Sequence, residues 1–281
     1  MTPLGPGEMR AHARPFVVLA IAGLRLVCGL CLAWPLAALL AESGASQTGR
    51  GDRVLFESGG YLLLEVLRVA GPDLLAVAHG LIPLVLLGLL LMAACNAALM
   101  LALNLRGKLA LIVWVSQAAA RVPAFVVVGL GSGLTQLVCA LLGALLIDTV
   151  PETMTRPAAT TALQLALWLL LSLVLGAVGS FSDVVKAALV RHEAGVAHAL
   201  THAARCARRA PLRTCLGFLP YALAFLVALW GASKLTSLLD VSAPGAWRVA
   251  LVFGLHQAVI ICSVALRAAW FARALRLAAS V

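Results

Sequence analysis

Residues 74–103 read LLAVAHGLIPLVLLGLLLMAACNAALMLAL, and this stretch decides the fold class. It is a continuous apolar run without Asp, Glu, Lys or Arg, and it lacks the alternation of a β-strand. A helix needs about 20 mostly apolar residues to cross a hydrocarbon core of about 30 Å, so the run is long enough to span a membrane. Continuous runs favour helices over a transmembrane β-barrel, whose strands alternate between apolar and polar residues.

The remaining sequence has the same apolar character. Of its 281 residues, 63% are hydrophobic and 11% are charged, with a mean hydropathy of +1.04. Soluble domains hold roughly 45–50% apolar and about 25% charged residues, so a soluble globular protein is excluded. We expect an all-α, polytopic membrane helix bundle that forms a single integral membrane domain over residues 1–281. Its six predicted spans are residues 16–41, 74–103, 122–147, 159–182, 212–239 and 247–271.

The positive charges predict the orientation of the chain. With six spans both termini lie on one side, and most Lys and Arg residues fall in segments on that side. Because cytoplasmic loops carry the excess of Lys and Arg, both termini are expected in the cytoplasm, and the composition favours a bacterial inner (plasma) membrane. The net charge of +10 is interpreted as this bias and not as nucleic-acid binding. The first span is too long for the roughly 7–15-residue core of a cleaved signal peptide, so we expect a retained anchor.

Two apolar segments are too short to cross a membrane and are predicted to lie at its surfaces. Residues 61–69 would lie on the outer surface, as an interfacial helix between the first two spans. Lys108–Arg121 precedes Pro123 and would lie at the inner interface. The alternative for this second segment is one long, tilted helix from Leu109 to Ile147.

The most informative polar segment runs from Ser182 to Pro211. Ser182 is expected to cap the start of a helix, and Gly195 is expected to break it. From Val196 onward, apolar and basic residues separate onto opposite faces at 100° per residue. The apolar arc comprises Val196, Ala199, Leu200, Ala203, Ala207 and Ala210, and the opposite arc comprises His198, His202, Arg205 and Arg209.

A basic amphipathic helix over about residues 195–211 is typical of a helix that lies on an anionic leaflet. Its expected partners are lipids of the anionic inner leaflet, with a membrane-protein partner or a second copy of this chain as alternatives. The residues expected to contact them are His198, His202, Arg205, Arg208, Arg209 and Arg213. His198, His202 and Cys206 also have a spacing that could place three metal ligands on one helix. Because Arg205 and Arg209 share the stripe, we expect neither a metal nor a cofactor.

Polar residues inside predicted spans allow two interpretations. They are Arg25, Asn96, Gln136, His256 and Gln257. In the first interpretation Arg25 extends to the inner headgroups, and Asn96, His256 and Gln257 hydrogen-bond neighbouring helices. In the second, the chain is a transporter or permease subunit with a polar path near Arg25, Asn96 and His256. No Asp or Glu falls inside a predicted span, which argues against a proton or cation relay.

Sequence motifs for catalysis are absent. The chain has no His-Glu-x-x-His, no Gly-Lys-Ser/Thr P-loop and no Gly-x-Ser-x-Gly. Cys28 and Cys31 form a CxxC pair inside an apolar span, where a thiolate is costly, so a packing role is expected. We therefore expect no enzyme but a structural, assembly or accessory component of the membrane.

One resemblance supports this architecture. Residues 181–190, FSDVVKAALV, are followed by Gly195, by Ala199-Leu200 and by Arg-Arg-Ala-Pro at 208–211. This pattern resembles the inner loop of poorly characterised six-helix bacterial membrane proteins, which are similar to the membrane domain beside glycerophosphodiester phosphodiesterases. The resemblance implies a six-helix architecture. It implies no activity, because this chain has no phosphodiesterase catalytic domain.

Overall fold

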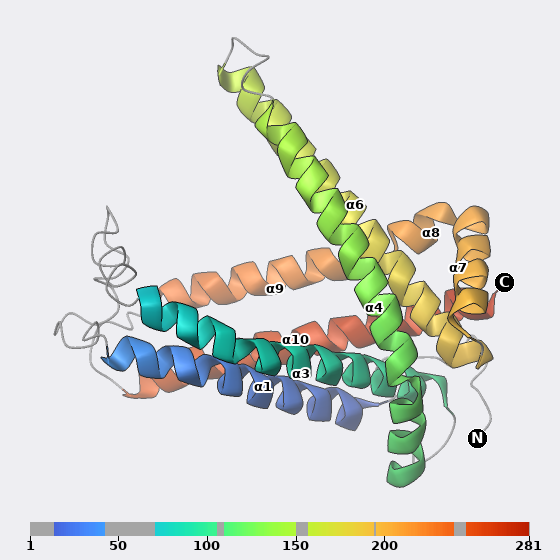
Figure 1. Cartoon of the computed structure of the whole chain (residues 1–281), viewed down its shortest axis with the longest axis horizontal. Helices are drawn as coiled ribbons and strands as arrows, with labels where there is room; N and C mark the ends of the chain where they lie inside the picture. The colour runs from blue at the N-terminus through green and yellow to red at the C-terminus, as the bar shows by residue number, and fades with distance from the viewer. Residues whose placement is uncertain are drawn as a thin grey trace. The chain divides into compact units, whose positions relative to one another are not determined.

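The computed structural model describes residues 14–42, 71–105, 110–149, 157–193, 195–238 and 246–280. These ranges are helical almost throughout and contain no β-strand, which confirms the all-α prediction (Figure 1). The predicted surface segment at residues 61–69 lies outside the described residues. The helices are α1 (Pro15–Glu42), α3 (Gly71–Asn104), α4 (Leu111–Asp148), α6 (Pro157–His192), α7 (Val196–Arg209), α8 (Pro211–Cys215), α9 (Leu219–Leu238) and α10 (Ala246–Ala279).

Six helical segments in the described ranges are long and apolar enough to cross a membrane, as the sequence predicts. They are Pro15–Pro35, His79–Asn104, Leu111–Asp148, Ala159–His192, Pro211–Leu238 and Ala250–Ala279. Such a set is typical of a multi-pass membrane protein.

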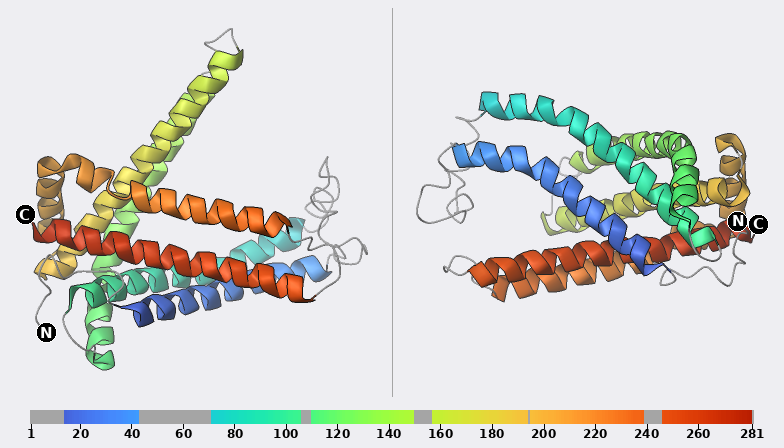
Figure 2. Two further views of the ribbon diagram at one scale, coloured as in Figure 1. Left: turned by 180° about the vertical axis from the view of Figure 1, so that it is seen from behind. Right: turned by 90° about the horizontal axis from the view of Figure 1, so that it is seen from below.

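The chain divides into two compact units. Unit 1 comprises Met1–Val17, Ala93–Phe225 and Ala265–Val281, and unit 2 comprises Val18–Met92 and Leu226–Val264. In unit 1, α4 and α6 form a long antiparallel hairpin whose helices lie side by side (Figure 1, Figure 2). Gly143 permits this approach, because a Cβ atom there would lie 2.7 Å from the Leu171 side chain. The predicted single domain thus contains two separately packed parts.

Two helix boundaries in unit 1 differ from the first prediction. Lys108–Arg121 is, from Leu111 onward, continuous with α4, which runs through Pro123 to Asp148 as the alternative of one long helix predicted, and the position of this segment at the inner interface stays a prediction. Figure 1 shows α4 bending in its first third, and Pro123 inside the helix explains such a bend. At 1.5 Å per residue α4 is about 57 Å long, well beyond the hydrocarbon core.

The second boundary, at Ser182, is wrong. This residue lies in the interior of α6, which begins at Pro157 and ends at His192, so it does not cap a helix. The cause is tertiary packing, because apolar residues on all sides of the following turns are buried and keep the helix intact. The expected break at Gly195 is confirmed: Glu193 adopts a left-handed φ of 51°, and Gly195 is the N-cap of α7.

The core of unit 1 is concentrated at one end. Buried residues fill the C-terminal parts of three helices, α3, α6 and α10, and one face of α7. In α6 the buried run is Ser182–Val185 followed by Ala187–Val190, which leaves only Lys186 partly accessible. These turns form the centre of a bundle, because a helix buried on every side has neighbours all around it.

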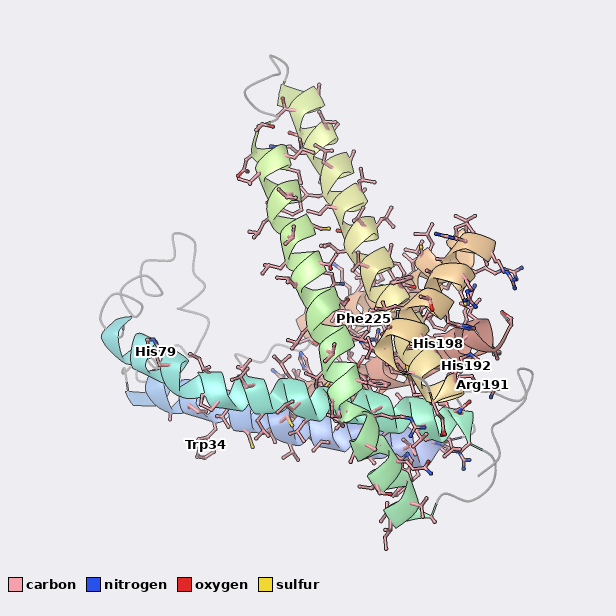
Figure 3. The ribbon with its side chains drawn as sticks, turned by 45° about the vertical axis from the view of Figure 1, so that its right-hand side comes forward. Trp34, His79, Arg191, His192, His198 and Phe225 are labelled. Carbon is pink, nitrogen blue, oxygen red and sulfur yellow. The ribbon has the colours of Figure 1, made fainter. Side chains whose placement is uncertain are left out.

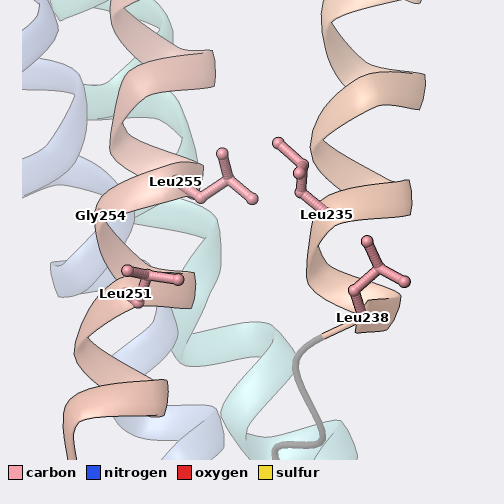
Figure 4. Close-up of a pocket in the computed structure, with 5 residues that line it drawn as sticks. All are labelled: Leu235, Leu238, Leu251, Gly254 and Leu255. Atoms are coloured by element: carbon pink, nitrogen blue, oxygen red, sulfur yellow. The ribbon is translucent and has the colours of Figure 1, made fainter.

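Unit 2 contains the remaining parts of α1, α3 and α10 and most of α9, and its large apolar side chains are largely exposed. Examples are Trp34, Leu89 and Trp230. A cavity of about 620 Å³ is lined by leucines and one glycine, as Figure 4 shows. In water such a surface would promote aggregation, whereas hydrocarbon accommodates it. This unit therefore has the surface of a lipid-exposed bundle.

Candidate functional site

The candidate site is the end of unit 1 formed by residues 180–215 and 265–280, which we call the α7 end. Helix α7 packs on it through Ala199, Ala203 and Cys206, whose small side chains let the helices approach closely. The Cys206 thiol lies 3.7 Å from the carbonyl oxygen of Leu277 in α10 and donates to it. Burial raises the pKa of the Cys206 thiol, so it stays protonated and keeps its donor. The face of α7 that packs here is fixed to the protein.

His202 does not lie on the outward arc that helical periodicity predicts. It is 6% exposed, and its Nε2 atom lies 2.9 Å from the carbonyl oxygen of Ala278. The Nε2 atom of His192 lies 3.3 Å from the same oxygen, and the two imidazole rings are 4.5 Å apart. The periodic pattern fails at His202 because this residue lies at the edge of the polar arc, where the end of α10 covers it.

These contacts complete the C-terminus of α10. The last four carbonyl groups of a helix have no partner within the helix. In α10, which ends at Ala279, the carbonyls of Leu277 and Ala278 are met by Cys206, His202 and His192 from α7 and α6. Side chains from two helices, α6 and α7, thus meet the last carbonyls of the third, α10.

The opposite face of α7 is basic and exposed. His198, Arg205, Arg208 and Arg209 are all exposed, as is Arg213 in the adjoining α8. Figure 3 shows His198 at the same end as Arg191 and His192. Within the described part of the chain, none of these arginines pairs with a carboxylate. Four guanidinium groups are therefore available to an anionic ligand from outside.

Three other arginines of unit 1 already have partners in the protein. Arg121 pairs with Glu193 at 2.8 Å, and Arg191 donates to the Asn104 side chain at 3.1 Å. Arg14 donates to the carbonyls of Ala102 and Leu105, at the end of α3. Cations near a helix C-terminus stabilise it through the macrodipole. The structure thus separates arginines that fix helices from those that face outward on α7 and α8.

A buried ion cluster was missed by the sequence analysis. The Asp183 side chain is 3% exposed, and its Oδ1 atom lies 2.9 Å from Nη2 of Arg267 and 3.7 Å from Nζ of Lys186. The indole Nε1 of Trp270 donates to Oδ2 at 2.9 Å. Because a buried charge is tolerated only when it is paired and hydrogen-bonded, the cluster fixes α6 to α10.

This cluster corrects the expectation that no acid lies inside a spanning helix. Asp183 belongs to Ala159–His192, one of the six segments long and apolar enough to cross a membrane. The sequence carried one signal, the spacing of Asp183 and Lys186 by three residues on one helix face. It carried none for Arg267, which lies 84 positions away.

The polar residues expected inside spans have local partners where the structure shows them. Gln136 in α4 donates to the Leu175 carbonyl of the neighbouring helix α6 at 2.8 Å. The Nδ1 atom of His256 lies 2.8 Å from the Val252 carbonyl one turn earlier in its own helix, whereas the packing interpretation expected a bond to a neighbouring helix. Asn96 is half-buried in unit 1, and Arg25 and Gln257 are half-buried in unit 2.

Neither a metal centre nor a relative assigns a function. Among the described residues, no three His, Cys, Asp or Glu side chains gather as metal ligands. No family model matches the chain, and no curated protein or solved structure matches it. A functional assignment must therefore rest on the chemistry of the α7 end.

Proposed function

We propose that this chain is a multi-pass protein of the bacterial inner membrane without catalytic chemistry, which docks the basic face of α7 on anionic lipid headgroups. It would serve there as a structural, assembly or accessory component, with both termini in the cytoplasm. The observation that carries the proposal is the set of exposed arginines on α7 and α8, with the other face of α7 fixed to α6 and α10. The arginines are Arg205, Arg208 and Arg209 of α7 and Arg213 of α8.

The packing of α7 holds its exposed arginines on one side of the bundle, where they can contact a leaflet together. Each Lys or Arg close to an anionic leaflet gains about 1 kcal/mol, so several on one face act together. Guanidinium groups bind phosphate oxygens through paired hydrogen bonds, which makes a phospholipid headgroup a suitable ligand. A helix already packed on the bundle loses little further conformational freedom when it docks.

A transport subunit is the runner-up, and the contacts of the polar residues favour docking over it. A path requires polar groups that face a shared aqueous space. Gln136 and His256 instead hydrogen-bond to helix carbonyls. The cavity of unit 2 is lined by Leu235, Leu238, Leu251, Gly254 and Leu255, which offer no polar side chain to a solute.

The docking proposal is tested on the full chain reconstituted in bilayers. Electron spin resonance of spin-labelled phosphatidylglycerol and phosphatidylcholine measures which lipid the protein retains beside it. We expect a preference for phosphatidylglycerol that weakens as salt rises, because the Debye length falls from about 8 Å at 0.15 M to about 3 Å at 1 M. A variant carrying Arg205→Gln, Arg208→Gln and Arg209→Gln would lose roughly 3 kcal/mol of attraction at about 1 kcal/mol each.

The matched control is Lys234→Gln, which removes an exposed cation from α9. It is expected to leave the lipid preference unchanged. Equal retention of the two lipids by the parent protein, at every salt concentration, would contradict docking. Reporter fusions at residues 194 and 281 test the orientation and are expected to report the cytoplasm, whereas fusions at residues 44–51 are expected to report the outer side.

A further inference from the structure

A second cavity lies in unit 1, between α4 and α6 and beneath α7 and α8. Its volume is about 650 Å³, within the roughly 300–1,000 Å³ of sites that hold small organic ligands. Most of its lining is apolar or glycine, including Val128, Gly131 and Val178. The walls from α4 and α6 belong to segments long and apolar enough to cross a membrane. These properties suit a hydrocarbon chain.

One polar group in the lining has no partner. Ser182 lines the cavity and is 4% exposed, and its hydroxyl finds no hydrogen bond within the described part of the chain. Thr135, another lining residue, does satisfy its hydroxyl, by donating to the Gly131 carbonyl at 2.8 Å. Leaving a buried donor unsatisfied costs about 1–3 kcal/mol, and nearly all buried polar groups in proteins are paired. The Ser182 oxygen is itself covered by the protein, so it reaches an acceptor on a ligand when its side chain turns into the cavity.

Helix α7 offers charged side chains to a second part of the ligand. Val196 and Leu200 of α7 line the cavity, while Arg205, Arg208 and Arg209 of the same helix are exposed. Along the α6 wall, Ser182 and Val185 lie toward α7, and the apolar lining extends away from them to Val174. Helix α7 therefore presents apolar side chains to the cavity and arginines on a different, exposed face. A phospholipid likewise combines an apolar acyl chain with an anionic phosphate.

We propose that this cavity binds one anionic phospholipid. One acyl chain fills the space between α4 and α6, and an ester carbonyl accepts a hydrogen bond from the Ser182 hydroxyl. The phosphate contacts the exposed arginines of α7 and α8. The headgroup part of this assignment rests on the proposed docking function, whereas the chain and ester contacts rest on the cavity itself.

Two glycines of α4 provide a matched pair of variants. A Cβ atom at either Gly131 or Gly133 would meet nothing within 4 Å, so a side chain can begin at either position without a clash. Gly131 lines the cavity and Gly133 is absent from its lining. Gly131→Leu therefore fills space that the acyl chain needs, and Gly133→Leu adds the same side chain elsewhere on the helix.

The test is native mass spectrometry of the full chain in detergent, titrated separately with phosphatidylglycerol and phosphatidylcholine. We expect one retained phosphatidylglycerol on the parent protein, an affinity at least tenfold lower in Gly131→Leu, and no change in Gly133→Leu. Retention by Gly131→Leu equal to that of the parent would overturn the cavity assignment and leave the docking proposal intact.

The assignment of an anionic headgroup can be overturned independently of the cavity site. If the parent retains phosphatidylcholine as tightly as phosphatidylglycerol, and Gly131→Leu loses both, the anionic headgroup is wrong, and the docking function falls with it. In that outcome the cavity remains an acyl-chain site. The triple arginine variant should weaken phosphatidylglycerol alone, and an equal effect on both lipids would overturn the phosphate contact.

Discussion

Two stretches of α6 have similar apolar content and opposite surroundings. In residues 165–174 large side chains such as Trp168, Leu169 and Leu170 are exposed, whereas Val184, Val185, Ala187 and Ala188 are fully buried. The exposed stretch is rich in Leu, and the buried stretch is rich in Ala and Val. Small residues allow helices to pack closely, whereas leucine is as apolar as a lipid tail and gains little from burial against another helix in a membrane. Hydropathy alone therefore does not tell which part of a spanning helix contacts protein.

The two stretches also differ in charge. Asp183 and Lys186 lie in the buried stretch and none of the ionisable side chains of α6 lies between residues 165 and 174. The charges are tolerated because Arg267 and Trp270 approach from α10. Protein neighbours thus permit what hydrocarbon would exclude.

The largest expected effect comes from breaking the ion cluster. Asp183→Ala would leave Arg267 and Lys186 without their carboxylate, and removing one partner of a buried pair costs about 3–5 kcal/mol. The measurement is the free energy of unfolding in mixed micelles. Asp148→Ala, which removes an exposed carboxylate at the end of α4, is the matched control and should cost little. Equal losses in both variants would show that the cluster does not stabilise the fold.

The same substitution, Leu→Ala, made once in each stretch of α6 compares the buried stretch with the exposed one directly. Leu189 is 4% exposed and Leu169 is 68% exposed, in the same helix. Leu189→Ala removes buried methyl groups and should cost about 2–5 kcal/mol of unfolding free energy. Leu169→Ala should change it by less than about 0.5 kcal/mol. A substantial loss at Leu169 would mean that the exposed stretch is covered by protein, such as a second copy of this chain.

Variants at the two histidines of α7 distinguish the face that packs on the bundle from the face proposed to dock on lipid. His202→Ala removes the nearer of the two imidazoles at the Ala278 carbonyl and should lower the unfolding free energy by about 0.5–1.5 kcal/mol, the usual net value of one hydrogen bond. His198→Ala, on the exposed face, should leave stability unchanged and weaken phosphatidylglycerol binding. The reversed pattern would place the packed and docking faces of α7 the wrong way round. Thermal unfolding and lipid titration of both variants decide between these outcomes.

The smallest expected effect is that of Ser182→Ala. Because its hydroxyl has no partner in the protein, replacing it should leave the unfolding free energy unchanged or slightly raised. Phosphatidylglycerol affinity should fall severalfold, by the loss of one hydrogen bond worth about 0.5–1.5 kcal/mol. A destabilised variant with unaltered lipid affinity would show that the hydroxyl serves the fold instead.

The spanning segments could be predicted because hydropathy is a local property. The start of α7 could also be predicted, since Gly195 separates two helical patterns. Ser182 could not be placed, because a serine before an acid resembles a cap unless the packing of the following turns is known. The same reason applies to His202: periodicity assigns a residue to a face, but a distant helix end decides whether that face is covered.

The candidate site was only partly visible in the sequence. Its exposed arginines were predicted, and the structure places Arg205, Arg208 and Arg209 on the surface. The Asp183 cluster and the cavity beside Ser182 depend on residues from several helices, which no single stretch of sequence brings together. Local patterns thus predicted which residues lie on the surface of the site. The interior of the site depends on long-range contacts, which local patterns do not predict.

The separation of Asp183 from Arg267 has a consequence for biosynthesis. The two residues are 84 positions apart, and a ribosome adding about 5–20 residues per second needs roughly 4–17 s to supply the second after the first. During that interval α6 carries an acid without its principal cation, and the carbonyls at the end of α10 do not yet exist. The bundle can close only when α10 has been made, so a chain stalled before α10 exposes Asp183 without its Arg267 partner to the quality-control machinery of the membrane.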